Sequence, residues 1–165
     1  MKVLILYTEL ADYFLACLKE LENHVDEIHV IHWPESDEAP FIFKVPDKVI
    51  LHNKTSDYKE LFNLSKMINP SIILCSGWVD SNYLKIVKYY NNKIPTVLLF
   101  DNQWKSSLKQ VLGVLLSTIL LKNKFSNVWV TGKSSKYFAN KLGFSDYKIL
   151  TGLYSADTPK FSKFR

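Results

Sequence analysis

The chain lacks the cysteine and histidine patterns that build metal or redox sites. Its two cysteines, Cys17 and Cys75, lie far apart and form no CxxC pair, which favours small buried apolar residues in a reducing compartment. Its four histidines show no HxxxH spacing, so a zinc site is not expected. We predict no metal site and no cofactor bound by this chain.

Long apolar runs are also missing. Lys2 is followed by five apolar residues, Val3 to Tyr7, whereas the apolar core of a signal peptide needs about 7–15. The longest uncharged apolar-rich stretch, residues 110–121, is shorter than the ~18 residues of a membrane-spanning helix. We therefore expect a protein that is cytoplasmic, or peripheral on the inner membrane face.

Three sequence motifs for binding or hydrolysis are absent. No GxGxxG follows the first apolar run, and no GxSxG occurs anywhere. Gly132-Lys133-Ser134 looks like the end of a P-loop, but that motif needs a glycine five residues earlier, and position 127 is Asn. The usual dinucleotide fingerprint, the hydrolase elbow and a triphosphate loop are thereby excluded.

What the chain does contain is a regular alternation of short apolar runs and amphipathic stretches. With 165 residues, 47% of them apolar, it is one ordered domain of ordinary size. The alternation implies right-handed βαβ crossovers and predicts an α/β fold: a doubly wound, mainly parallel Rossmann-like sheet of about six to seven strands with helices on both faces. Strands are expected at 2–7, 27–32, 48–52, 71–75, 95–100, 127–130 and 147–150, and helices at 9–23, 56–68, 80–90, 105–121 and 134–142. The expected helix caps are Thr55 or Ser56, Asp80, and Ser134 or Ser135.

Charge is distributed unevenly. Residues 1–104 carry 10 Lys and 14 acidic residues, a net charge of −4, whereas residues 105–165 carry 10 Lys, one Arg and 2 acidic residues, a net charge of +9. The basic part favours an anionic partner, such as a phosphorylated substrate or a membrane surface. A solvated lysine-rich face is the alternative. A nucleic-acid partner is not expected, because the aromatic residues of this part are spaced for core packing.

Polar and aromatic residues follow the expected strands, and in a parallel sheet these segments meet at one edge. Asp101 is the candidate general base, since it follows a buried strand and precedes two neutral amides; capping the helix near Lys105 is its alternative role. Glu9 is the second candidate, and its alternative role is that of an acid in the first turn of a helix. Trp78 and Trp104 are expected to stack on a sugar, or to cover the core. The expected acceptor-binding residues are Thr8, Glu9, Gly77, Trp78, Asn102, Gln103, Trp104, Gly132 and Lys133.

The expected helix at 105–121 has more apolar residues than one buried face needs. We assign its core stripe to Leu108, Val111, Leu112, Leu115 and Ile119, which leaves Val114, Leu116, Leu120 and Leu121 outside it. Excess apolar surface with flanking lysines is typical of a helix in a membrane interface. A helix buried between the sheet and a neighbour is the alternative. The lysines expected to contact the membrane are Lys105, Lys109, Lys122 and Lys124.

The later motifs resemble the N-terminal domain of a GT-B glycosyltransferase of the group 1 (family 4) type, as found in bacterial surface-polysaccharide synthesis. The resemblance is carried by Asp101-Asn102-Gln103-Trp104-Lys105, by residues 128–134, by Lys141-Leu142-Gly143-Phe144 and by residues 148–157, including Gly152-Leu153-Tyr154. It implies that residues 1–155 form the acceptor-binding domain. Residues 156–165 would then begin a linker to a missing C-terminal domain that binds the nucleotide-sugar donor.

The resemblance implies that the parent protein moves a sugar from a nucleotide-sugar to a glycan or lipid-linked acceptor, and that this chain alone is inactive. The chain's partners would be that acceptor and its own C-terminal domain. Asp101 is the position that would match the family's base. The alternative from the residues is a stand-alone, flavodoxin-like binding or regulatory module, which would need no second domain.

Overall fold

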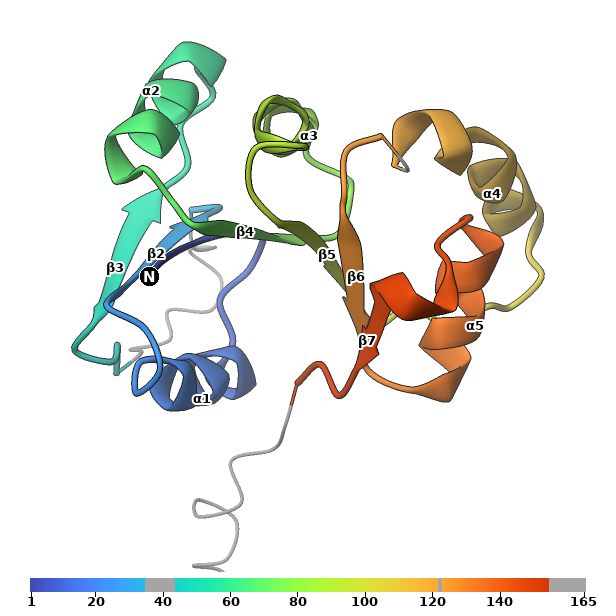
Figure 1. Cartoon of the computed structure of the whole chain (residues 1–165), viewed down its shortest axis with the longest axis horizontal. Coiled ribbons are helices and arrows are strands. Elements are labelled where there is room, and N and C mark those ends of the chain that lie inside the picture. Colours follow the sequence, from blue (N-terminus) through green and yellow to red (C-terminus); the bar gives the residue numbers. More distant parts are fainter. Residues whose placement is uncertain (35–43, 122, 155–165) are drawn as a thin grey trace, which may run out of the picture.

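The computed structural model describes residues 1–34, 44–121 and 123–154 of the chain, and these build one seven-stranded sheet. All neighbouring strands are parallel, in the order β3-β2-β1-β4-β5-β6-β7 (Figure 1). The predicted α/β, Rossmann-like fold is confirmed. The strands are β1 (Lys2–Tyr7), β2 (Glu27–His32), β3 (Val49–Asn53), β4 (Ile72–Ser76), β5 (Thr96–Phe100), β6 (Asn127–Val130) and β7 (Ile149–Thr151).

The helices lie close to their expected positions. They are α1 (Asp12–Leu21), α2 (Tyr58–Ile68), α3 (Ser81–Tyr90), α4 (Leu108–Leu120) and α5 (Lys133–Lys141), with a short 3-10 turn, η1 (Asp146–Lys148). The largest differences are at the starts of α1 and α4, which begin later than the sequence suggests. Both differences matter for the site, because the first leaves Glu9 in a loop and the second puts Ser107 at the cap of α4.

The strand order reverses direction between β1 and β4. The chain runs outward from β1 through β2 to β3, then returns to β4 and runs outward the other way to β7. Right-handed crossovers then place α1 on one face of the sheet and the helices after β3 on the other, as Figure 1 shows for α1, α2 and α3. A flavodoxin-like sheet has the order 2-1-3-4-5, so the flavodoxin-like topology of the alternative is wrong.

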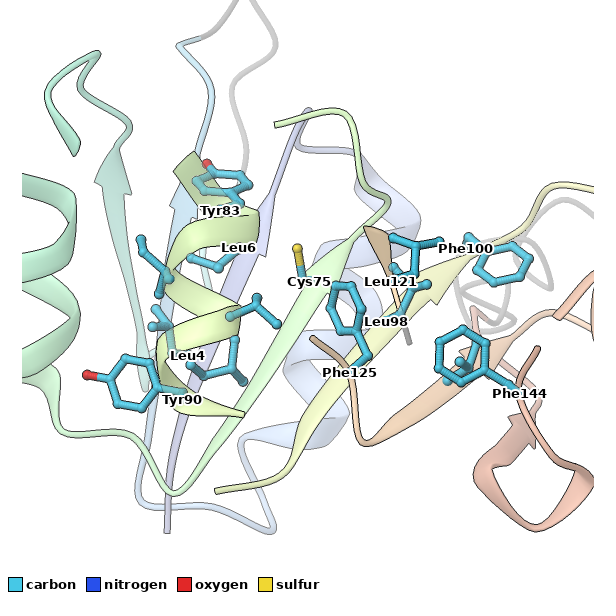
Figure 2. Close-up of a cluster of buried hydrophobic side chains, with 14 of the residues drawn as sticks. Leu4, Leu6, Cys75, Tyr83, Tyr90, Leu98, Phe100, Leu121, Phe125 and Phe144 are labelled. Carbon is cyan, nitrogen blue, oxygen red and sulfur yellow. The ribbon is translucent and has the colours of Figure 1, made fainter. Parts of the chain in front are cut away.

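Alternate residues of each central strand enter two hydrophobic clusters. Leu4 and Leu6 of β1 face the cluster under α2, α3 and α5, whereas Val3, Ile5 and Tyr7 face the cluster under α1. Figure 2 shows the first cluster, where Tyr83 and Tyr90 of α3 lie over the sheet. Burial on both faces explains why these strands read as continuous apolar runs.

Two aspartates fix the starts of α2 and α3. The Asp80 side chain accepts from the backbone N–H groups of Asn82 and Tyr83, which confirms Asp80 as the cap of α3. For α2 the expected cap, Thr55 or Ser56, is wrong. The helix begins later, so Asp57 is the residue whose carboxylate reaches the first turn, at 2.7 Å from the Lys59 nitrogen.

Helix α4 packs with the opposite face to the one expected. Four of the predicted core residues are exposed: Leu108 at 83%, Val111 at 40%, Leu112 at 60% and Leu115 at 67%. The side towards the core instead carries Ser117 and Leu121, which are buried, and the half-buried Val114. The apolar spacing correctly predicted a helix, but it could not identify the side that meets the sheet.

Among the described residues, no helix combines the length and the apolar character needed to cross a bilayer. Over the same part of the chain, no three or more His, Cys, Asp or Glu side chains gather where they could hold a metal ion. Both cysteines are free; Cys75 is buried, which raises the pKa of its thiol, while Cys17 is half-buried.

Two histidines far apart in the sequence meet on β2 and β3. The rings of His29 and His52 are stacked, with 3.0 Å between His29 Nδ1 and His52 Nε2. His29 Nε2 lies 3.2 Å from a Glu27 carboxylate oxygen. Burial, followed by the charges of His29 and His32, lowers the pKa of His52.

This pair predicts that the fold loses stability in mild acid. A histidine whose pKa is lowered by folding stabilises the protein above about pH 6.5, its unfolded value, and this contribution is lost as pH falls through the folded pKa. We expect the urea midpoint to fall between pH 7.5 and pH 5, and to fall less in His52→Gln. His24→Gln is the control, because His24 is exposed and should leave the profile unchanged. Equal losses in His52→Gln and the parent chain would contradict this assignment.

Candidate functional site

The carboxyl ends of β1, β4, β5 and β6 bring the predicted site residues to one edge of the sheet. Thr8 and Glu9 follow β1, Gly77 and Trp78 follow β4, Asp101 follows β5, and Gly132 follows β6. Backbone hydrogen bonds join the ends of neighbouring strands. One of them runs from the Gly77 nitrogen to the Leu99 carbonyl oxygen at 2.8 Å and joins the end of β4 to β5. Because the chain reverses direction between β1 and β4, this edge is the place where open α/β sheets bind ligands.

Asp101 lies in the loop between β5 and α4, and its side chain is exposed. Helix α4 begins at Leu108 with Ser107 as its cap, so the alternative role of Asp101 as a helix cap is wrong. The Asp101 backbone carbonyl accepts a hydrogen bond from the buried Ser135 hydroxyl at 3.0 Å. The loop is thereby anchored to the first turn of α5, while its carboxylate remains available to solvent.

Asn102 and Gln103 continue this loop and are both exposed. The Gln103 backbone carbonyl accepts from the Gln110 amide at 2.7 Å, and the Gln110 side-chain oxygen accepts from the Lys105 backbone nitrogen. Gln110 therefore holds the loop from the first turns of α4. The two predicted amides are placed beside Asp101, facing water rather than the core.

The N-terminus of α5 lies at the same edge. Gly132 is the N-cap residue and makes no side-chain cap hydrogen bond, so the expected cap at Ser134 or Ser135 is wrong. Ser135 is turned inward, where its hydroxyl lies 3.0 Å from the Thr131 hydroxyl. Lys133 is exposed beside this end, and its charge adds to the positive end of the helix dipole.

Trp78 and Trp104 pack on the same buried phenylalanine from different loops. The ring centroids of Trp78 and Phe138 lie 6.3 Å apart, and those of Trp104 and Phe138 lie 5.6 Å apart. Trp78 also meets Phe100 edge to face at 5.6 Å. Each indole is half-buried. Part of each indole therefore covers the core, which was one of the two expected roles, and the remaining part is open to solvent.

Thr8 and Glu9 have different surroundings. Thr8 is half-buried, and its backbone carbonyl accepts from the Trp33 nitrogen at 3.0 Å, which joins the ends of β1 and β2. Glu9 is exposed. Helix α1 starts at Asp12 after the N-cap residue Ala11, so Glu9 does not lie in the first helical turn, and its alternative role there is wrong.

A tyrosine cluster at this edge was not expected from the sequence. The Tyr7 hydroxyl donates to the Tyr154 hydroxyl at 3.0 Å, and Tyr154 packs edge to face on Tyr13 at 5.0 Å. Burial is the main cause that raises the pKa of Tyr154. The nearby Asp101 carboxylate raises this pKa further, whereas the hydrogen bond with Ser76 lowers it. Tyr154 thus lies between the ends of β1, β4 and β5. From the sequence, the motif Gly152-Leu153-Tyr154 indicated only a segment that leads into a linker.

Tyr154 adopts a left-handed backbone conformation, with φ of 66°. For a residue with a side chain this conformation is strained. One residue earlier, the Leu153 nitrogen bonds to Val130 O at 3.1 Å, which holds the segment after β7 beside the end of β6. The β1–β4 end of the edge is therefore partly covered by Tyr154, while Asp101, Asn102 and Gln103 stay exposed.

A buried polar group joins the ends of β2, β3 and β4. Asp80 Oδ2 accepts from the Trp33 indole at 2.9 Å and pairs with the Lys54 ammonium at 3.2 Å. The sequence suggested Asp80 only as a cap. Its carboxylate is fully used by these contacts and by the α3 cap, so Asp80 supports the strand ends and is not free for proton transfer.

No family model and no curated protein matches this sequence. Among solved structures, the chain is similar to the UDP-GlcNAc 2-epimerase from Methanocaldococcus jannaschii, with a TM-score of 0.55 and 15% identity over 92% of this chain and 45% of that one. It is also similar to S. aureus MnaA in a co-structure with UDP, with a TM-score of 0.52 and 10% identity over 91% of this chain and 43% of that one.

At these identities the likeness concerns the fold alone. The chain spans less than half the length of either solved structure. The likeness fits a GT-B-like domain with a Rossmann-like sheet and does not single out the group 1 (family 4) type.

Proposed function

We propose that the chain is the acceptor-binding half of a glycosyltransferase that moves a sugar from a nucleotide-sugar to a glycan or lipid-linked acceptor in cell-surface polysaccharide synthesis. The observation that carries the proposal is the exposed Asp101 carboxylate at the ligand-binding edge, beside the open sides of Trp78 and Trp104. A carboxylate there serves to accept a proton from an acceptor hydroxyl. Half-exposed indoles offer an apolar surface to a sugar ring.

The other predicted residues have complementary roles in this proposal. Asn102 and Gln103 orient the acceptor hydroxyl, and Lys133 with the first turn of α5 attracts an acceptor phosphate. The donor site belongs to a second domain that follows this chain. Under this proposal the 165-residue chain binds acceptor but transfers no sugar.

A tryptophan-fluorescence titration tests which ligand the chain holds. We expect a short-chain polyprenyl-diphosphate N-acetylglucosamine to change the emission, and UDP-N-acetylglucosamine to leave it unchanged. Trp104→Phe should weaken the first binding roughly fivefold, since stacking contributes on the order of 1 kcal/mol. Trp129→Phe is the matched control, because its indole donates to Thr151 O in another part of the sheet. Binding of the nucleotide-sugar alone would contradict the acceptor assignment.

A substitution at Asp101 tests the base. In a protein where this chain is joined to its donor-binding domain, Asp101→Asn should lower the transfer rate about a hundredfold, because a general base contributes at least that much. Acceptor binding should change little. Glu9→Gln is the comparison, since Glu9 is another exposed acid at this edge. A full loss of transfer in Glu9→Gln with normal rates in Asp101→Asn would move the role to Glu9.

A further inference from the structure

The outward side of α4 is an apolar surface without a partner in the described chain. At the 100° spacing of a helix its exposed residues cover about half of the circumference. They are Leu108, Val111, Leu112, Leu115, Leu116 and Leu120, each between 40% and 83% exposed. Contiguous exposed apolar patches of this kind mark interaction surfaces.

The inward side of α4 is the more polar of the two. Ser117 is 1% exposed, and its hydroxyl donates to the Val114 carbonyl at 2.7 Å and to the Leu142 carbonyl at 3.2 Å. Leu121 is buried at the end of the helix. In this orientation the buried hydroxyl has a partner in the loop after α5, as a buried polar group requires.

The stretch of sequence that contains α4 is basic. Residues 102–145 contain seven lysines and no acidic residue. Lys105 is exposed before α4, and the Lys124 ammonium donates to the Leu120 carbonyl at its end. An apolar helix face with lysines at both ends fits a partner whose surface carries negative charges and whose interior, directly below them, is apolar. Two copies meeting through this face would instead bring their lysines together.

We propose that α4 docks this domain on an anionic lipid bilayer, with the outward leucines in the boundary between headgroups and acyl chains and the lysines at the lipid phosphates. A surface helix of this type binds by apolar burial together with attraction to anionic headgroups. The proposal uses no property of the sugar site, so it stands or falls independently of the proposed function.

Vesicle co-sedimentation of the full chain tests the proposal. We expect binding to vesicles of equal phosphatidylglycerol and phosphatidylcholine, weaker binding to phosphatidylcholine alone, and a marked loss when salt rises from 50 to 500 mM. The double variant Leu112→Ser with Leu115→Ser should bind at least tenfold more weakly. Met67→Ser is the matched control, because Met67 is 82% exposed on α2 and should leave binding unchanged.

Light scattering after size exclusion, with circular dichroism of each variant, completes the test. A folded double variant that still binds anionic vesicles like the parent chain would overturn the proposal. So would equal binding to both vesicle types, or no binding to either. A dimer of the parent chain that the double variant abolishes, without lipid binding, would assign the face to a second copy instead.

Discussion

Replacing Tyr83 with alanine should destabilise the fold by about 4 kcal/mol, the usual cost of removing a large aromatic side chain from a packed core. Tyr83 of α3 is 1% exposed. Its hydroxyl lies 3.2 Å from the carbonyl of Tyr7 and 3.0 Å from that of Ile31, at the ends of β1 and β2. The variant loses the ring that fills this space and the donor that both carbonyls share. Urea unfolding, followed by circular dichroism, measures the loss.

Tyr83→Phe separates these two contributions. It keeps the ring and removes the hydroxyl, so we expect a loss of about 1 kcal/mol, the net worth of an ordinary hydrogen bond. Tyr147→Ala is the control for loss of a tyrosine as such, because Tyr147 is 83% exposed and should change stability little. If Tyr83→Ala cost no more than Tyr147→Ala, the packing of α3 on the strand ends would be different from that described here.

Replacing Asp80 with alanine is expected to cost about 3 kcal/mol, because removing one member of a buried ion pair leaves its partner without compensation. The Lys54 ammonium, with a side chain only 20% exposed, loses its carboxylate. The Trp33 indole loses its acceptor, and α3 loses its cap. The same urea experiment measures the effect.

Asp57→Ala is the matched control for Asp80→Ala. Asp57 caps α2 through the Lys59 nitrogen but is exposed, so its loss should cost about 1 kcal/mol, as for an ordinary cap. Equal losses in the two variants would mean that the contacts of Asp80 with Lys54 and Trp33 contribute nothing. The Asp80 and Tyr83 variants should not be additive, because both side chains hold the first turn of α3.

Both substitutions also bear on the proposed site. Asp80 and Tyr83 hold the start of α3, and the segment from Gly77 to Trp78 connects that start to β4. We expect the acceptor titration of Asp80→Asn, which keeps a capping oxygen, to be weakened only modestly if the variant remains folded. The strand ends would then be supported mainly by Tyr83.

Much of the candidate site was predictable because it depends on strand ends. Parallel strands place the residues that follow them at one edge whatever the details of packing, so Asp101, Gly77 and Gly132 could be assigned to it from the sequence. The hydrogen bond between the Tyr7 and Tyr154 hydroxyls was not predictable, since 147 residues separate them. The contact of Asp80 with Trp33 likewise crosses 47 residues.

The amino-acid sequence by itself determined the strands, the helices and the crossovers between parallel strands, because these follow from local periodicity and from burial on both sheet faces. The tertiary structure alone decided which way α4 faces. An apolar spacing of three and four residues defines a stripe but does not state what covers it. With the leucines outward, the buried Ser117 hydroxyl bonds to the Leu142 carbonyl, and that contact joins two segments that no local pattern connects.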